Sequence, residues 1–268
     1  MLRIKRNEIC ISVIGTSSGI PLVFNIHFRG TMDHWDPDFI NPLAATRPIL
    51  LWGNCSFKEW AQNIVGVIEA LGIKQVDVLG FSMGGCVAQL IAINNPNLVR
   101  KLVLAGTVPS EGLGVVKGAP EPVGMLATAA TEEENHQGFL KTFYTLSDKK
   151  QAIGEKWWKR MTSARKDRSD YLGPEGTQNQ IAAMLKWLGG EFREDGSYDR
   201  LAELTLPVFN ANGCNDVLAP TENSYVMYKK MVNAEAHLHV FPDSGHGFLN
   251  EYASTYSTMV IDFLDGKW

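Results

Sequence analysis

Short apolar, β-branched runs alternate with helical patterns along most of the chain, and this alternation limits the fold more than any other feature. Between Phe57 and Leu71, and again from Met83 until Pro96, apolar residues recur with the helical period of roughly 3.6 residues. Strands that alternate with helices predict an α/β fold, with a mostly parallel central sheet flanked by helices. The strand-like runs are ICISVI, PLVFNI, RPILLW, VDVLG, KLVLAG, LPVFNANG and HLHVF.

One long segment interrupts the alternation. Residues 110–200 contain no strand-like run of comparable quality and instead show helical stretches rich in large apolar side chains. We therefore predict a core domain formed by residues 1–109 and 201–268, with an inserted helical cap at 110–200. The large apolar side chains of the cap are Phe139, Phe143, Trp157, Trp158, Met161, Met184 and Trp187, and either the cap's own core or a substrate pocket would account for them.

Composition excludes several classes of protein. The chain has 268 residues, a net charge of −4 and scattered charges, which argues against a nucleic-acid-binding surface. Its four cysteines lie far apart, so they predict neither a metal site nor a disulfide scaffold, and a cytoplasmic location is expected. The stretch MLRIKRNEICISVIG resembles a signal peptide but is better interpreted as a strand, and no segment is predicted to span a membrane.

Ser82 is the strongest candidate for a catalytic residue. It lies in GFSMG, between the strand-like run VDVLG and the helical run MGGCVAQLIAIN. A G-x-S-x-G pattern at a strand-to-helix turn typically holds a nucleophilic serine in a strained conformation, with glycines relieving the steric clashes. The same turn directs the Met83 amide at an oxyanion. The alternative is that Ser82 only caps the helix.

A serine hydroxyl needs a base and a group that orients the base. His246 follows the last strand-like run and is flanked by Gly245 and Gly247, so we predict it as the base, with a turn-capping histidine as the alternative. Asp216 follows the run LPVFNANG and is the predicted orienting acid; an Asx-type turn is its alternative role. Glu111 is the reserve acid.

The order Ser82, Asp216, His246, together with the cap, resembles the α/β-hydrolase superfamily over essentially the whole chain. It is most similar to the cap-bearing esterases, lactonases and non-haem haloperoxidases. The segments that carry the resemblance are IHFRGTMDHWDP, GFSMGG, NGCNDVLAPTENSY and FPDSGHGF. The resemblance implies that Ser82 attacks a carbonyl, His246 moves the proton and Asp216 fixes the imidazole tautomer. It also implies the Phe28 backbone amide as the second oxyanion donor.

The chain departs from the family pattern at two places. The tripeptide IHF stands where His-Gly-aromatic is usual, so His27 replaces the glycine and is either a structural residue or a substrate contact. The segment LLWGNCSFKEW passes from strand to helix in a few residues, where relatives have a longer loop at the active-site mouth. We expect a reshaped pocket here, with Trp52, Asn54 and Cys55 beside the gap.

The sequence thus predicts a serine hydrolase without cofactor or metal, acting on a small hydrophobic ester or lactone through an acyl-enzyme. Carbon–carbon bond hydrolysis, perhydrolysis, acyl transfer and lyase chemistry use the same triad and remain alternatives. A non-hydrolytic small-molecule-binding protein of the same fold is a further alternative, because of the two departures. Whether the chain forms a homodimer is left open.

Overall fold

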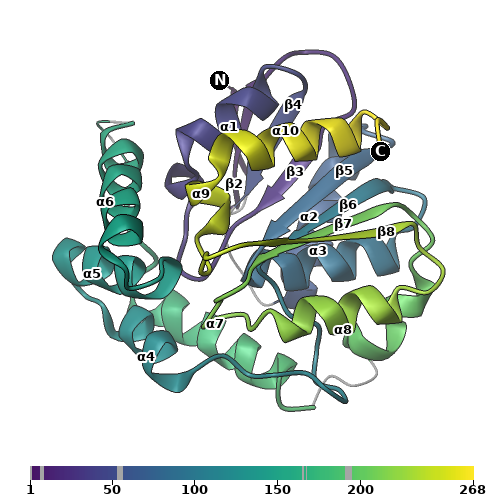
Figure 1. Ribbon diagram of the computed structural model, residues 1–268. Helices are drawn as coiled ribbons and strands as arrows, with labels where there is room; N and C mark the ends of the chain where they lie inside the picture. Colours follow the sequence, from purple (N-terminus) through teal and green to yellow (C-terminus); the bar gives the residue numbers. More distant parts are fainter. Residues whose placement is uncertain (1, 7–8, 53–56, 165, 167, 191–194) are drawn as a thin grey trace.

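The computed structural model describes residues 2–6, 9–52, 57–164, 166, 168–190 and 195–268, and within them the strands form one eight-stranded sheet (Figure 1). The strands are β1 (Leu2–Arg6), β2 (Ile9–Gly15), β3 (Leu22–Asn25), β4 (Pro48–Trp52), β5 (Val76–Phe81), β6 (Val99–Ala105), β7 (Val208–Gly213) and β8 (Ala236–Phe241). Their order is β1-β2-β4-β3-β5-β6-β7-β8, and only β2 runs against its neighbours. The predicted mostly parallel sheet is confirmed.

Helices cover both faces of this sheet (Figure 1). They are α1 (Pro37–Ala44), α2 (Phe57–Ala70), α3 (Met83–Asn94), α8 (Glu222–Lys230), α9 (Phe248–Glu251) and α10 (Ala253–Leu264), with 3₁₀ turns η1 (Met32–His34) and η2 (Tyr198–Glu203). Alternate side chains of β3 point to opposite faces: Leu22 and Phe24 pack in the apolar cluster of α1 and α10, and Val23 packs in that of α2 and α3. Burial on both faces explains why the strand runs are continuously apolar.

The described residues between β6 and β7 include four α-helices: α4 (Pro120–Thr128), α5 (Glu132–Phe143), α6 (Asp148–Ser163) and α7 (Pro174–Trp187). Local sequence explains where α5 begins, because the Thr131 hydroxyl accepts from the Glu134 amide while the Glu134 carboxylate accepts from the Thr131 amide. Phe139, Phe143 and Trp157 are buried and belong to the same apolar cluster as α1 and α10. These four helices therefore pack on the carboxyl side of the sheet and share its core.

Ion pairs fasten α6 to the core. Arg160 binds Asp36, the N-cap of α1, through two bonds: Nε to Oδ1 at 2.8 Å and Nη2 to Oδ2 at 2.6 Å. Lys150 Nζ lies 2.5 Å from Glu251 Oε2 in α9, and both side chains are buried. Removing one partner of such a shielded ion pair lowers the free energy of unfolding far more than removing one partner of an exposed pair.

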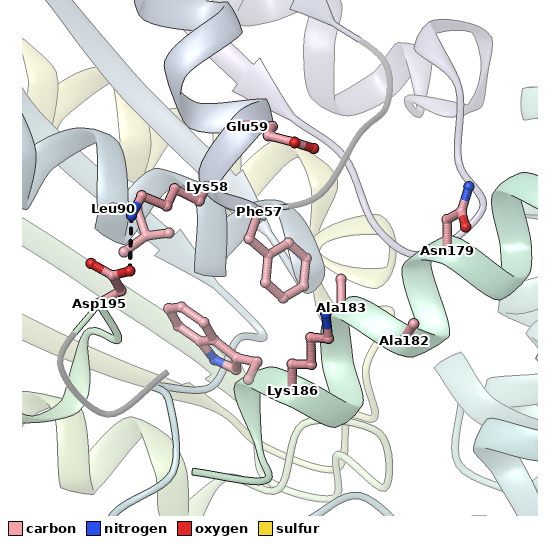
Figure 2. A pocket seen from close by; sticks show the side chains of 10 residues that line it. Phe57, Lys58, Glu59, Leu90, Asn179, Ala182, Ala183, Lys186 and Asp195 are labelled. Atoms are coloured by element: carbon pink, nitrogen blue, oxygen red, sulfur yellow. Dashed lines mark hydrogen bonds and ion pairs between the residues drawn. The ribbon is translucent and has the colours of Figure 1, made fainter. Parts of the chain in front are cut away.

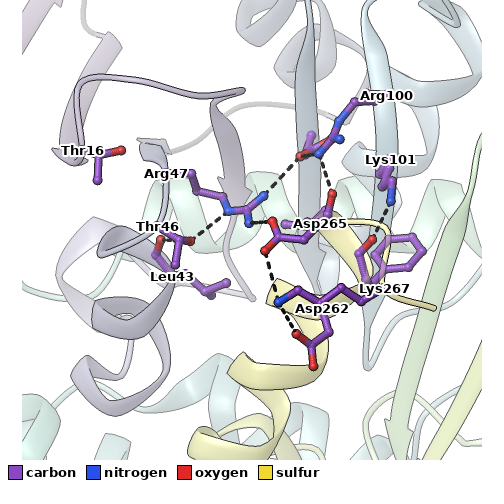
Figure 3. A network of polar contacts seen from close by, with 12 residues as sticks. Thr16, Leu43, Thr46, Arg47, Arg100, Lys101, Asp262, Asp265 and Lys267 are labelled. Carbon is purple, nitrogen blue, oxygen red and sulfur yellow. Dashed lines mark hydrogen bonds and ion pairs between the residues drawn. The ribbon is translucent and has the colours of Figure 1, made fainter.

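A second polar network lies near the amino ends of the strands (Figure 3). Asp77, near the start of β5, is fully buried and receives Arg100 through Nε at 2.9 Å and Nη2 at 2.6 Å. Arg47 Nη1 lies 3.7 Å from Asp77, and Arg47 Nη2 donates to Asp265 at 2.6 Å. Burial raises the pKa of Asp77 although both arginines oppose this shift. The network ties the end of α10 to the sheet, at the opposite end of β5 from Ser82.

Candidate active site

Ser82 stands on a sharp turn between β5 and α3. Its backbone has φ 57° and ψ −122°, a conformation that residues with a Cβ rarely adopt and that costs of order 1–3 kcal/mol. The Ser82 amide donates to the Ala105 carbonyl at 2.9 Å, and the Thr107 hydroxyl donates to the Ser82 carbonyl at 2.7 Å. Its side chain makes no capping hydrogen bond to α3, so the structure does not favour the helix-cap alternative.

The two glycines of the motif are required by close backbone packing. A Cβ on Gly80 would come closer than 3.0 Å to the Gly84 carbonyl oxygen. A Cβ on Gly84 would come equally close to the Asn25 carbonyl, at the end of β3. Their lack of side chains lets the turn close tightly and lets the segment after β3 approach it.

His246 and Asp216 meet across the loops that follow β8 and β7. His246 Nδ1 lies 2.6 Å from Asp216 Oδ2, and both side chains are almost wholly buried. The other carboxylate oxygen, Asp216 Oδ1, accepts from the amides of Leu218 at 2.9 Å and Ala219 at 2.8 Å. With Oδ2 as acceptor, Nδ1 carries the proton and Nε2 keeps a lone pair, which is the tautomer a general base needs.

The imidazole of His246 lies next to the residues that flank Ser82. Its ring stacks on Phe81 with centroids 4.9 Å apart, and a Cβ on Gly106, at the end of β6, would lie 3.4 Å from its Nδ1 and Cε1. His246 Nε2 is buried and has no hydrogen-bond partner among the described residues, and no bond joins it to the Ser82 hydroxyl. Such bonds are often open in the absence of substrate. Ser82 itself is half-buried.

Two backbone amides are suited to bind an oxyanion. Met83 is the first residue of α3, and an amide at this position has no acceptor within its own helix. Phe28 follows β3, in the segment that the absent Gly84 side chain allows close to the turn. In the described part of the chain, neither amide donates to another protein group. Both predicted donors are therefore available on the side of the sheet where Ser82 lies.

His27 is buried beside the same aromatic residues as His246. Its ring contacts Phe81, Phe139 and Phe143 edge-on, each with centroids 5.5 Å apart. The pKa of His27 is lowered to about 4, mainly by burial; the electrostatic influence of His246 also lowers it, and the hydrogen bond to the Phe28 carbonyl opposes the shift. His27 is therefore neutral near pH 7 and donates through Nδ1 to the Phe28 carbonyl at 2.9 Å. This contact supports a structural role in shaping the oxyanion loop.

The other predicted residues fall outside this group or outside the described residues. Trp52 ends β4 and pairs with Ile11, but its side chain is not in the described part, and neither are Asn54 and Cys55. Glu111, the reserve acid, is exposed and lies against Gly190. The structure brings His246 together with Asp216 and not with Glu111.

Phe143 contacts the candidate base, and sequence reasoning did not assign it to the site. Its ring meets His246 edge-on with centroids 5.0 Å apart, and its carbonyl accepts from the Gly247 amide at 2.8 Å. Helical periodicity alone marks Phe143 only as an apolar position of the cap. The contact joins residues that are about one hundred positions apart, so no local pattern signals it.

A cavity of about 660 Å³ lies between α2, α3 and α7 (Figure 2). Phe57 and Trp187 form part of its wall, with ring centroids 5.5 Å apart, while Lys58 pairs with Asp195 at 2.8 Å. Phe57 begins α2, directly after the shortened connection that follows β4. The cavity thus lies where the sequence departs from the family pattern, although its wall does not include Ser82.

The described part of the chain contains neither a cluster of metal ligands nor a membrane-spanning helix. There, no group of three His, Cys, Asp or Glu side chains is arranged to hold a metal ion. Nor does any helix of this part have the length and apolar character needed to cross a membrane.

The sheet order, the strained serine and the His246–Asp216 pair together define a protein of the α/β-hydrolase class. Residues 33–251 match the family model described as alpha/beta hydrolase fold, and the chain belongs to this family. It is 30% identical over 219 residues to a 2-hydroxy-6-oxononadienedioate/2-hydroxy-6-oxononatrienedioate hydrolase of Paraburkholderia xenovorans, covering 76% of this chain and 67% of the relative. It is 28% identical over 218 residues to a 2-hydroxymuconate semialdehyde hydrolase of Pseudomonas putida, covering 79% and 70%.

A solved structure confirms the fold independently. An alpha/beta hydrolase fold protein from Chitinophaga pinensis superposes with a TM-score of 0.84 at 26% sequence identity, covering 98% of this chain and 96% of that one. Hydrolase chemistry of the α/β-hydrolase type is the activity that these comparisons support.

Proposed function

We propose that this protein is a cofactor-free serine hydrolase that cleaves a carbon–carbon bond next to a ketone or aldehyde carbonyl. The buried His246–Asp216 pair beside the Ser82 turn is the observation that carries the proposal, because it provides a base of the correct tautomer for a nucleophile. We assign Ser82 as nucleophile, His246 as base and acid, Asp216 as the orienting acid, and the Met83 and Phe28 amides as oxyanion donors.

The relatives' names support carbon–carbon cleavage over the ester or lactone hydrolysis expected from the sequence. The compounds in those names carry oxo or semialdehyde, hydroxyl and carboxylate groups, and the names mention no ester or lactone. Hydrolysis of such a molecule must break a carbon–carbon bond. The sequence-based alternative of carbon–carbon hydrolysis is thus better supported than the ester or lactone substrate, which stays a prediction.

The proposed reaction uses each of these groups in turn. The Ser82 hydroxyl gives its proton to His246 Nε2 and bonds to the carbonyl carbon, and the resulting oxyanion is held by the Met83 and Phe28 amides. Collapse of this intermediate expels a carbanion, so the departing fragment must delocalise charge, as an enolate does, and His246 protonates it. Water, deprotonated by His246, then releases the acid from Ser82.

The helices between β6 and β7 take part in this proposal as a cap. We assign residues 1–109 and 201–268 to the core and 110–200 to the cap, whose residue Phe143 packs on His246. Phe81 and Phe143 pack against the imidazole, so the base lies among apolar rings that hold its orientation.

The test compares two chromogenic substrates on the same protein. Loss of the conjugated absorbance of 2-hydroxymuconate semialdehyde reports carbon–carbon cleavage, and p-nitrophenyl butyrate reports ester hydrolysis. We expect kcat/KM for the first to be at least about tenfold higher, and both activities to vanish in Ser82→Ala. Ester turnover alone would reject the carbon–carbon proposal and keep the nucleophile, whereas activity that survives in Ser82→Ala would reject the nucleophile.

A further inference from the structure

Arg29 follows the proposed oxyanion donor Phe28 and reaches into the cap. Its backbone is left-handed, with φ 59°, and its amide donates to the Gln180 side chain of α7 at 2.7 Å. The side chain is buried, with a residue exposure of 8%. The segment after β3 therefore carries a guanidinium away from Ser82 and into the space between the cap helices.

The guanidinium has only neutral partners among the described residues. Nη1 donates to the Leu126 carbonyl at 2.7 Å and to Asn135 Oδ1 at 3.3 Å, and Nε donates to the Leu172 carbonyl at 3.4 Å. Nη2 has no protein acceptor there. Other arginines with described side chains do have a carboxylate partner: Arg47, Arg100, Arg160, Arg168 and Arg200.

Burying a cation without a negatively charged partner costs free energy. The position of Arg29 therefore favours a partner that the described residues do not supply. Burial lowers the pKa of Arg29, and the electrostatic influence of Tyr171 opposes this shift. Carbonyl bonds hold the side chain in place but carry no negative charge. A ligand that brings a carboxylate would supply the compensation and form charge-assisted hydrogen bonds.

A cavity of about 420 Å³ lies next to this cation. Its wall is formed by Arg29 and by residues of α4, α5, the 168–173 segment and α7, including Thr128, Tyr171 and Thr177. The first turn of α7 also lines it, and the N-cap residue Gly173 gives no side-chain cap. Pro174 has no amide hydrogen, and the Thr177 amide donates to the Gly173 carbonyl at 2.9 Å, so these two lining residues of α7 offer no free backbone donor. The buried guanidinium is therefore the donor that faces this space.

The acids around this cavity lie in solvent rather than beside Arg29. Glu132 pairs with Arg168 at 3.3 Å and its side chain is 69% exposed, while Asp170 is also exposed. Neither carboxylate forms an ion pair with Arg29, whose guanidinium bonds are to neutral groups.

We propose that this cavity binds the carboxylate group of a small organic acid, with Arg29 Nη2 as its anchor. The ligand carboxylate approaches from the open side of the cavity and pairs with the guanidinium. The side chain stays fixed by its bonds to Leu126, Asn135 and Leu172, so binding requires little reordering.

The site is separate from the catalytic residues. Asn135 at one end of α5 contacts Arg29, and Phe143 at the other end contacts His246, which places the two sites roughly 12 Å apart along the helix axis. The carboxylate can thus belong to the distal end of an extended substrate or to a separate ligand. Both sources share the same recognition chemistry, and the site does not depend on the proposed reaction.

The test measures binding in the Ser82→Ala protein, so that no turnover interferes. Butyrate and its neutral analogue butyramide are titrated by calorimetry at constant ionic strength. We expect butyrate to bind at least about tenfold more tightly than butyramide, and Arg29→Gln to remove this preference while Arg29→Lys keeps part of it. Arg200→Gln is the control, because Arg200 lies outside the cavity and pairs with Glu203.

A second pair of variants leaves Arg29 in place in case Arg29→Gln does not fold. Thr128 is an exposed residue of the cavity wall whose hydroxyl bonds only to the Gly124 carbonyl. Thr128→Glu should weaken butyrate binding at least about threefold by charge repulsion, and Thr128→Gln should not. The proposal is wrong if butyrate and butyramide bind equally, or if Thr128→Glu and Thr128→Gln bind butyrate equally. Arg29 would then serve only to connect the segment after β3 to α4 and α7.

With the active enzyme, saturating butyrate then separates the two sources of the carboxylate. A rise in KM for a carboxylate-bearing substrate, with kcat unchanged, assigns the site to the substrate's own distal carboxylate. Unchanged KM, with butyrate bound, assigns it to a separate ligand.

Discussion

Replacing Asp216 by Asn tests whether this carboxylate sets the tautomer of His246. Asp216 Oδ1 accepts two backbone amides, from Leu218 and Ala219, and Oδ2 accepts the proton on His246 Nδ1. An asparagine has one acceptor oxygen, and the two amides require it on their side. The NH₂ group must then face His246 Nδ1, which becomes an acceptor and moves the ring proton to Nε2.

The change of tautomer at His246 sets the expected loss of turnover. With the proton on Nε2, the imidazole has no lone pair directed at Ser82 and cannot act as its base. The equivalent change in the chymotrypsin-type triad lowers kcat by about 10⁴, and we expect a loss of similar order here. This loss equals about 5.4 kcal/mol of transition-state stabilisation. The oxyanion amides and substrate binding remain, so the residual rate should still exceed that in water.

The assay combines turnover with a direct measurement of the tautomer. Nitrogen-15 chemical shifts of labelled histidine should show a protonated Nδ1 in the unchanged protein and a protonated Nε2 in Asp216→Asn. Glu111→Gln removes an exposed carboxylate that lies away from His246 and serves as the control. If Asp216→Asn keeps its rate within about tenfold of the unchanged protein, or the ring proton stays on Nδ1, the assignment of Asp216 is wrong.

Three further predictions concern stability, measured by urea unfolding. Ser82→Gly should raise the free energy of unfolding by about 1 kcal/mol while abolishing turnover, because glycine adopts φ 57° without a Cβ clash. An unchanged free energy of unfolding would show that the Ser82 backbone is not strained. Lowering the pH from about 6.5 to about 4.5 should cost the unchanged protein roughly 2 kcal/mol more than His27→Gln. In the folded protein the pKa of His27 is lowered to about 4, mainly by burial, so the unfolded chain binds the proton at higher pH and is favoured as the pH falls. If the free energies of unfolding of the two proteins depend on pH equally, this explanation is wrong. Arg100→Gln should lower the free energy of unfolding by about 3 kcal/mol, because the buried Asp77 then keeps only Arg47, at 3.7 Å, as a charged partner. Arg200→Gln removes a more exposed pair, with Glu203, and should lower it by under about 1 kcal/mol.

Local patterns were sufficient to predict the sheet. The seven apolar runs correspond to β2 through β8. The central strands β3 and β5 are buried along their whole length, which requires mostly apolar residues on both faces, whereas the edge strand β8 is half-buried and alternates histidine with apolar residues. The amino-terminal stretch, interpreted as one strand, instead forms the antiparallel pair β1 and β2. Charged residues alternate with apolar ones in LRIKR, a pattern that fits an edge strand but is too short to stand out.

The same local reasoning located the catalytic candidates but not their surroundings. GFSMG and SGHGF are visible in the sequence because glycines flank a reactive residue type directly after a strand-like run. The reasons for most of these glycines are not local: a Cβ on Gly84 would meet Asn25, and a Cβ on Gly245 or Gly247 would meet Phe143. The packing of Phe143 on His246 and the reach of Arg29 into the cap depend on how distant segments dock. Docking is decided by the whole core, so no short window of sequence records it.

These distant contacts give the cap a part in holding the candidate base. The Phe143 carbonyl accepts the Gly247 amide next to His246, and the Lys150–Glu251 pair joins α6 to the helix that follows the histidine loop. Glu251 also accepts the Ser244 hydroxyl at 3.0 Å, at the start of that loop. Because the imidazole must hold its place within a fraction of an ångström to act on Ser82, these α5 and α6 contacts belong to the catalytic framework.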